Sequence, residues 1–134
     1  MKRLALLVLA MLATPSAAHA AEVRVSNGLL RYEARPGFVS HAIFVESGGT
    51  VEVTTGTGDT DGLTAGPGCV DGTPMVCTTP AGTVAHIDAG DLSDRITIEG
   101  LTTIRATILL GEGNDAASGG GGNDVINGGP GNDE

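Results

Sequence analysis

Aromatic side chains and lysines are nearly absent from this chain. It has no Trp, one Tyr and two Phe among 134 residues, and Lys2 is its only lysine. A small helical or sandwich domain usually fills its core with large aromatic side chains, so their scarcity favours a thin interior lined by Val, Ile, Leu and Ala. The formal net charge of −9 argues against binding to nucleic acid or to anionic membrane surfaces.

Enzyme motifs are also missing. The chain contains no H-E-x-x-H, no G-x-S-x-G and no phosphate-binding loop. His41 and His86 alternate with apolar neighbours in predicted strands, which indicates solvent-facing strand histidines rather than catalytic bases. We therefore expect a protein that is not an enzyme.

No apolar run is long enough for a membrane helix. A basic start at Lys2 and Arg3 leads into the apolar run 4–13 and then into small residues that end at Ala20. This pattern predicts a secretory signal peptide at 1–20, whereas a membrane anchor needs about 18–20 apolar residues. We expect cleavage after Ala20, no membrane span in the mature chain, and a secreted, extracellular product.

Cysteine is limited to Cys69 and Cys77. In an exported chain an even number of cysteines favours a disulfide. Pro74 lies between them, and no histidine is near in sequence, so we expect a structural disulfide in a tight loop rather than a metal or redox site.

Glycine, by contrast, is abundant and periodic at the C-terminus. Three units follow one another at 110–118, 119–127 and 128–134, and each places Gly-x-Gly-Asn-Asp at the same phase. The period of nine is too short for a helical hairpin and suits a short strand followed by a glycine-rich turn. The repeated acidic residues are Asp115, Asp124 and Asp133.

The repeated residue types point to a site for a hard cation. Glycines with positive φ would turn the carbonyl oxygens of each turn inward, beside the Asp carboxylate. Carbonyl and carboxylate oxygens, with no His or Cys among them, are the ligands that Ca²⁺ prefers. The residues after each Asp should form a strand, with Ala117 and Ile126 facing inward. The turn glycines are Gly111, Gly113, Gly120, Gly122, Gly129 and Gly131.

Stacking of the units would bring ligands together. If two units make one coil of a solenoid, Asp115 and Asp133 become neighbours while Asp124 lies on the opposite side. Adjacent strands lie about 4.8 Å apart, and Ca²⁺–oxygen distances are about 2.3–2.6 Å. Two such distances span one strand spacing, so one ion can be bound between turns of successive coils.

The unit Gly-Gly-x-Gly-x-Asp-x-apolar-x resembles the RTX, or haemolysin-type, calcium-binding repeat. Residues 119–127 match every position, whereas Leu110 replaces the first Gly of the first unit. The resemblance implies a parallel β-roll with Ca²⁺ in its turns. An unstructured glycine-rich linker is the alternative, but it would not keep these positions in phase.

The middle of the chain has the pattern of β structure without helices. Asn27-Gly28 and Gly48-Gly49 predict hairpin turns, and a loop rich in Gly, Thr and Asp follows toward the cysteines. Asp59 and Asp61 in this loop resemble the start of a calcium loop, but an ordinary turn fits better because the later ligands are missing. The predicted strands are 22–26, 29–34, 38–46, 50–55, 83–87, 95–99 and 103–109.

The segment 89–96 resembles a degenerate repeat. Asp94 takes the ligand position, Gly90 a turn glycine and Ile96 the apolar site, but Leu92 stands where Gly is expected. The spacing from Asp94 to Asp115 is 21 residues rather than a multiple of nine. We therefore expect a structural turn that begins the solenoid, with ion binding by Asp94 as the less favoured alternative.

These observations predict an all-β chain in three parts. A signal peptide (1–20) precedes an antiparallel or irregular β cap with the disulfide (21–88), and the cap leads into a short parallel β-roll (89–134) whose nonapeptides occupy 110–134. The predicted function is secreted calcium binding, with folding of the glycine-rich turns on binding. The alternative is the N-terminal part of a larger secreted enzyme or adhesin. No pattern in the sequence identifies a protein partner.

Overall fold

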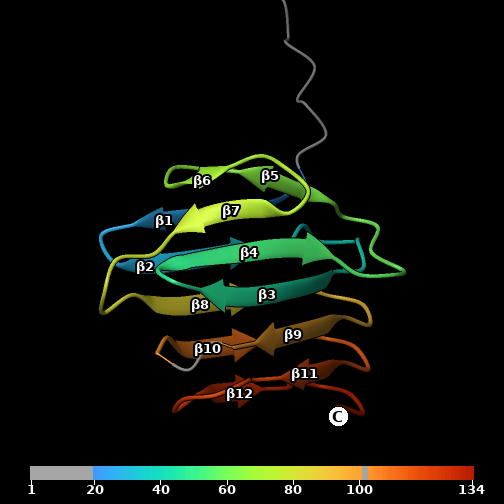
Figure 1. Cartoon of the computed structure of the whole chain (residues 1–134). Coiled ribbons are helices and arrows are strands. Elements are labelled where there is room, and N and C mark those ends of the chain that lie inside the picture. The colour runs from blue at the N-terminus through green and yellow to red at the C-terminus, as the bar shows by residue number, and fades with distance from the viewer. Residues whose placement is uncertain (1–19, 101–102) are drawn as a thin grey trace, which may run out of the picture.

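The computed structural model describes residues 20–100 and 103–134, and the described chain is all-β (Figure 1). Its strands form two six-stranded sheets, in the orders β12-β10-β8-β2-β1-β5 and β11-β9-β3-β4-β7-β6. The strands are β1 Ala21–Ser26, β2 Leu29–Glu33, β3 His41–Ser47, β4 Thr50–Thr55, β5 Leu63–Ala65, β6 Cys69–Val70, β7 Met75–Thr78, β8 Val84–Asp88, β9 Arg95–Glu99, β10 Arg105–Leu109, β11 Ala116–Ser118 and β12 Val125–Asn127.

The predicted strands are confirmed within a few residues of their ends. Their alternation explains why they form, since Val23 and Val25 are buried while the residues between them are partly exposed. Asn27 and Gly28 both have positive φ in the β1–β2 hairpin, which is the geometry that a two-residue turn needs. The predicted signal peptide lies outside the described residues except for Ala20.

Two predictions about the middle of the chain are wrong. The predicted strand at 38–46 begins only at His41, because Phe38 instead packs beneath the guanidinium of Arg35, 3.8 Å from ring centroid to Cζ. The predicted loop before β8 contains β5, β6 and β7, which are short strands with little periodicity to reveal them.

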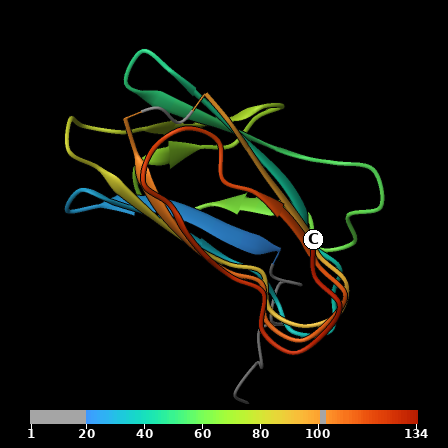
Figure 2. The same cartoon turned by 90° about the horizontal axis from the view of Figure 1, so that it is seen from below.

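Parallel pairing dominates the C-terminal half of both sheets. β2, β8, β10 and β12 pair in parallel in one sheet, and β3, β9 and β11 pair in parallel in the other. The chain therefore crosses repeatedly between the sheets, and its connections nest over one another at one edge (Figure 2). This pairing begins at β2 and β3, well before the repeats.

The core is a thin layer between the sheets. Tyr32 and Phe44 meet edge to face at 5.6 Å between ring centroids. The other buried side chains are mostly small or aliphatic, which agrees with the scarcity of aromatics in the sequence. The last strands are less covered: Ala117 packs against the core, whereas Ile126, in register with buried Ile108, is 45% exposed because β12 is the outermost strand.

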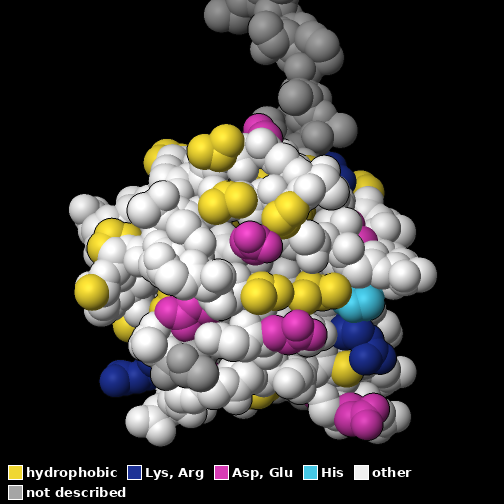
Figure 3. Space-filling model, in the orientation of Figure 1, with side chains coloured by type: hydrophobic (Ala, Val, Ile, Leu, Met, Phe, Trp, Pro, Cys, Tyr) yellow, Lys and Arg dark blue, Asp and Glu magenta, His cyan; other side chains and the backbone are white. Residues whose placement is uncertain are grey.

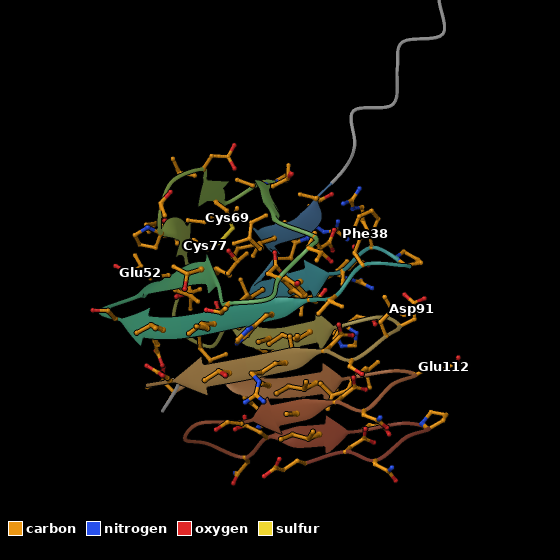
Figure 4. All side chains as sticks on the ribbon, turned by 90° about the vertical axis from the view of Figure 1, so that its right-hand side faces the viewer. Phe38, Glu52, Cys69, Cys77, Asp91 and Glu112 are labelled. Atoms are coloured by element: carbon orange, nitrogen blue, oxygen red, sulfur yellow. A yellow bond between two sulfur atoms is a disulfide. The ribbon has the colours of Figure 1, made fainter. Side chains whose placement is uncertain are left out.

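The opposite end of the stack carries the disulfide, and its strands pair antiparallel except for β5, which pairs in parallel with β1. Cys69 on β6 and Cys77 on β7 are paired residues and form the predicted disulfide. Its sulfur atoms lie at the upper end of the molecule in Figure 4, far from the last strands. Within the described residues, no helix has the length and apolar character needed to cross a bilayer.

Candidate metal centre

Four turns stack at the edge where the chain passes from the first sheet to the second. We call 34–40, 89–94, 110–115 and 128–133 the edge turns. Asp91 and Glu112 form a parallel bridge between two of them. Figure 4 shows Phe38, Asp91 and Glu112 one beneath another along this edge. The edge turns therefore follow one another at the spacing of adjacent strands.

The last residue position of each edge turn forms a column. Ser40, Asp94 and Asp115 directly precede His41, Arg95 and Ala116, which are in register. Each Asp carboxylate accepts the backbone N–H of the residue above it: Ser40 N to Asp94 Oδ1 is 2.7 Å, and Asp94 N to Asp115 Oδ1 is 2.7 Å. The structure also confirms that Asp115 and Asp133 are neighbours, since Asp115 N lies 3.1 Å from Asp133 Oδ1.

Glycine is required in the edge turns because of close backbone approach. A Cβ at Gly113 would collide with the carbonyl oxygen of Leu92, and one at Gly131 would collide with that of Gly113. Gly111 and Gly129 have φ of +95° and +83°, as predicted, and their Cβ positions also meet a carbonyl of the turn above. The prediction of positive φ is wrong for Gly113, whose need for glycine comes from packing alone.

The opposite edge holds the second repeat by itself. Asp124 Oδ1 accepts the backbone N–H of Ala106 at 2.8 Å, which places Asp124 away from the column as predicted. Gly120 and Gly122 precede it with φ of +70° and +111°. The residues in register with this position in the strands above are Ala106, Ala85 and Leu30, so no carboxylate stacks on Asp124.

Burial leaves charge uncompensated at the centre of the column. Asp94 and Asp115 are only 3% and 2% exposed, and the Oδ2 atom of each is buried without a hydrogen-bond partner. Burial raises the pKa of Asp94 to about 7, against the lowering effect of the Ser40 N–H, and the charges of Asp115, Asp91 and Asp61 raise it further. These are the features of carboxylates that lack a counter-ion.

Side chains alone do not make a metal site in the described residues. No group of three or more His, Cys, Asp and Glu side chains in residues 20–100 and 103–134 is arranged to hold an ion. Any cation at the edge turns must therefore take backbone carbonyl oxygens as further ligands, and the stacked carbonyls of the glycine turns are the donors available.

The other candidates have structural roles. Asp59 accepts the N–H groups of His41 and Gly62 at 2.9 and 2.7 Å, and Asp61 pairs with Arg35 at 2.6 Å, so the prediction of an ordinary turn is confirmed. The His41 ring lies 2.7 Å from the carbonyl oxygen of Thr57, measured from Nδ1. The side chains that Figure 3 colours as acidic are scattered over that face rather than gathered into a patch.

Sequence reasoning missed the extent of the column. Ser40 belongs to the column although its segment does not resemble a repeat, and its N–H donates to Asp94. Asp94 also belongs to it, since its N–H donates to Asp115 although the spacing between the two is not a multiple of nine. The ladder register supplies the signal that the spacing hid. Arg95 and Ala116 are in register although 21 residues separate Asp94 from Asp115, because β9 and β10 have five residues each where β11 and β12 have three.

Comparison with known proteins bears on the C-terminal part alone. No curated protein and no solved structure matches the chain. Residues 107–134 match the family described as the RTX calcium-binding nonapeptide repeat (4 copies). This match confirms the resemblance drawn from the nonapeptides.

Proposed function

We propose that this chain is a secreted calcium-binding protein whose repeats form a short parallel β-roll. The observation that supports it best is the pair Asp115 and Asp133, stacked in successive edge turns and joined by a 3.1 Å hydrogen bond from the Asp115 N–H to Asp133 Oδ1. The parallel register of β8, β10 and β12, and of β9 and β11, is the pairing that a roll requires.

In this proposal one Ca²⁺ lies between the turns 110–115 and 128–133. Its ligands come from Asp115, Asp133 and the carbonyl oxygens of Gly111, Gly113, Gly129 and Gly131. Asp124 with Gly120 and Gly122 forms a half-site on the other edge, which is weaker because nothing acidic is in register above it.

Binding and folding of the repeats are coupled in this mechanism. Without metal the stacked carboxylates repel one another, and ordering the glycine-rich turns costs conformational entropy. Ca²⁺ joins ligands from two turns at once, so its binding free energy stabilises the folded roll. Extracellular calcium modules bind at about 10⁻⁴–10⁻³ M, which favours folding after export.

The remaining parts have supporting roles. Residues 1–20 direct export, and the protein is not an enzyme. Residues 21–88 cap the roll, since the short strands β5 and β6 with the Cys69–Cys77 disulfide lie at the outer edges of the two sheets and leave little open strand for aggregation.

Calcium titration of the mature chain, followed by far-ultraviolet circular dichroism, tests the proposal. We expect a gain of β signal at about millimolar calcium, absent with magnesium at the same concentration. Asp133→Asn should raise the calcium concentration at the midpoint at least tenfold. Asp124→Asn, the matched control on the other edge, should change it less than threefold. An unchanged spectrum in calcium, together with no heat of binding by calorimetry, contradicts the proposal.

A further inference from the structure

The edge turn 89–94 lies outside the residues that match the calcium-binding repeats. It nevertheless ends in an aspartate, Asp94, that stacks in the same column as Asp115. Asp94 is buried, and its backbone N–H donates to Asp115 Oδ1 at 2.7 Å. Gly90 has a φ of +98°, close to the +95° of Gly111 below it. The turn therefore resembles a repeat turn at Gly90 and Asp94, and it departs from one at Leu92, whose φ is +77° whereas that of Gly113 is not positive.

Two buried oxygen atoms at this position lack any partner. The Oδ1 atoms of Asp94 and Asp115 each accept a backbone N–H, and both Oδ2 atoms are buried with none. An orphaned buried acceptor on a charged group is costly, and native structures satisfy such atoms with a donor, a water or an ion.

Within the described residues, no arginine, histidine or lysine forms an ion pair with Asp94 or Asp115. The ion pairs found in residues 20–100 and 103–134 join Arg24, Arg31 and Arg35 to other acids. Arg35, whose turn packs on this one, is already committed to Asp61 at 2.6 Å. Two carboxylates in adjacent turns without a counter-charge favour binding of an external cation.

A further donor and an entry route are present. The carbonyl oxygen of Leu92 points at Gly113, where an added Cβ would also lie 2.8 Å from Asp115 Oδ1. The Leu92 side chain is 45% exposed. A surface hollow of about 220 Å³ includes Asp94 in its wall, and its polar lining also contains Ser93, Asn114, His41 and Arg95.

We propose that Asp94 and Asp115 bind a second Ca²⁺ between the turns 89–94 and 110–115, with the carbonyl oxygen of Leu92 as a further ligand. This site rests on the proposed calcium function because it shares Asp115 with the first ion. It extends the ion column one turn beyond the repeats, into a turn that no glycine pattern identifies.

Terbium luminescence tests this site, because Tb³⁺ replaces Ca²⁺ and is excited through a nearby Tyr. Tyr32 is the only Tyr and there is no Trp. Its ring is buried, and its hydroxyl lies near enough to Asp94 to feel that charge, whereas Asp133 is two turns further along the column. Tyr-excited emission therefore reports mainly on the proposed site.

We expect calcium-displaceable Tb³⁺ emission from the mature chain and at least a tenfold loss in Asp94→Asn. Asp94→Ser is a second variant, chosen because Ser40 occupies the equivalent position of the turn above. It replaces Asp94→Asn in the test if the asparagine disturbs folding. Asp133→Asn should keep most of the emission. Tyr32→Phe should remove the emission without changing calcium binding by calorimetry.

Calorimetry separates this inference from the function it rests on. Full emission in both Asp94 variants, with unchanged calcium stoichiometry, overturns the second site while the repeat site stands. Loss of one calcium ion per chain in Asp94→Asn, and of a different one in Asp133→Asn, supports both. Absence of any calcium heat in the unmodified chain overturns both.

Discussion

The two edges of the stack differ in how well their repeats match the family pattern and in whether their aspartates stack. The better match has the isolated aspartate. The second repeat, 119–127, matches the family pattern at every position, yet Asp124 stands alone on its edge. The first repeat, 110–118, departs from the pattern at Leu110, yet Asp115 lies between Asp94 and Asp133. A nonapeptide thus provides only half of a site, and the turn stacked on it decides whether the ligands meet.

Removing the central carboxylate should have the largest effect on this comparison. Asp115→Asn removes a negative charge from both proposed calcium sites of the column, so we expect calcium affinity to fall on the order of 1,000-fold. Asp124→Asn removes the same group at the isolated position and should change the affinity less than threefold. Calorimetry at fixed ionic strength measures both. Equal losses of calcium affinity in the two variants would contradict the argument that only one edge brings its ligands together.

Acid should relieve the repulsion between the buried carboxylates of the column in the absence of metal. The pKa of Asp94 is raised to about 7 in the folded chain by burial and by Asp115, Asp91 and Asp61. The folded state therefore binds this proton more tightly than the unfolded state, and stability falls as pH rises from about 4 to 7. With calcium chelated, we expect Asp94→Asn to remove a pH-dependent loss of up to about 4 kcal/mol.

Urea unfolding of both chains at several pH values measures this difference. All other ionisable groups are present in both chains, so the difference between the two profiles isolates Asp94. Parallel pH profiles for the two chains would mean that Asp94 does not carry the effect.

Adding one methyl group to each edge sharpens the comparison further. Gly113 has no positive φ, but a Cβ there collides with the rigid carbonyl of Leu92, so Gly113→Ala should cost about 1–3 kcal/mol. Gly119→Ala meets the Asp124 side chain at 3.0 Å, which can move, and should cost less than about 1 kcal/mol. Thermal unfolding in saturating calcium compares the two, and a larger cost at Gly119 would refute the argument.

The smallest expected effect is a gain at Leu92. Its φ of +77° is unfavourable for a side chain, and glycine would relieve this by about 1 kcal/mol before its own entropy cost. Leu92→Gly should therefore raise the unfolding temperature slightly. Asn27→Gly, at φ +51°, is the control because Asn tolerates this region better. A destabilised Leu92→Gly would show that the leucine side chain contributes packing instead.

The strands and hairpins of this fold could be predicted from local pattern. Alternation in β1 and the Asn27-Gly28 turn fix a hairpin without reference to the rest of the chain. The short strands β5 to β7 could not be found in this way. Their pairing depends on β1 and β4, which lie far away in sequence.

By itself, the sequence determined that three aspartates share one phase, that their turns are rich in glycine, and that Asp115 meets Asp133, because a constant period fixes which units stack. The tertiary structure decided that Ser40 and Asp94 join the same column and that the residues in register with Asp124 on the paired strands β10, β8 and β2 are not acidic. Those facts depend on the register of the parallel sheets, in which the longer strands β9 and β10 change the spacing in sequence while the strands remain aligned.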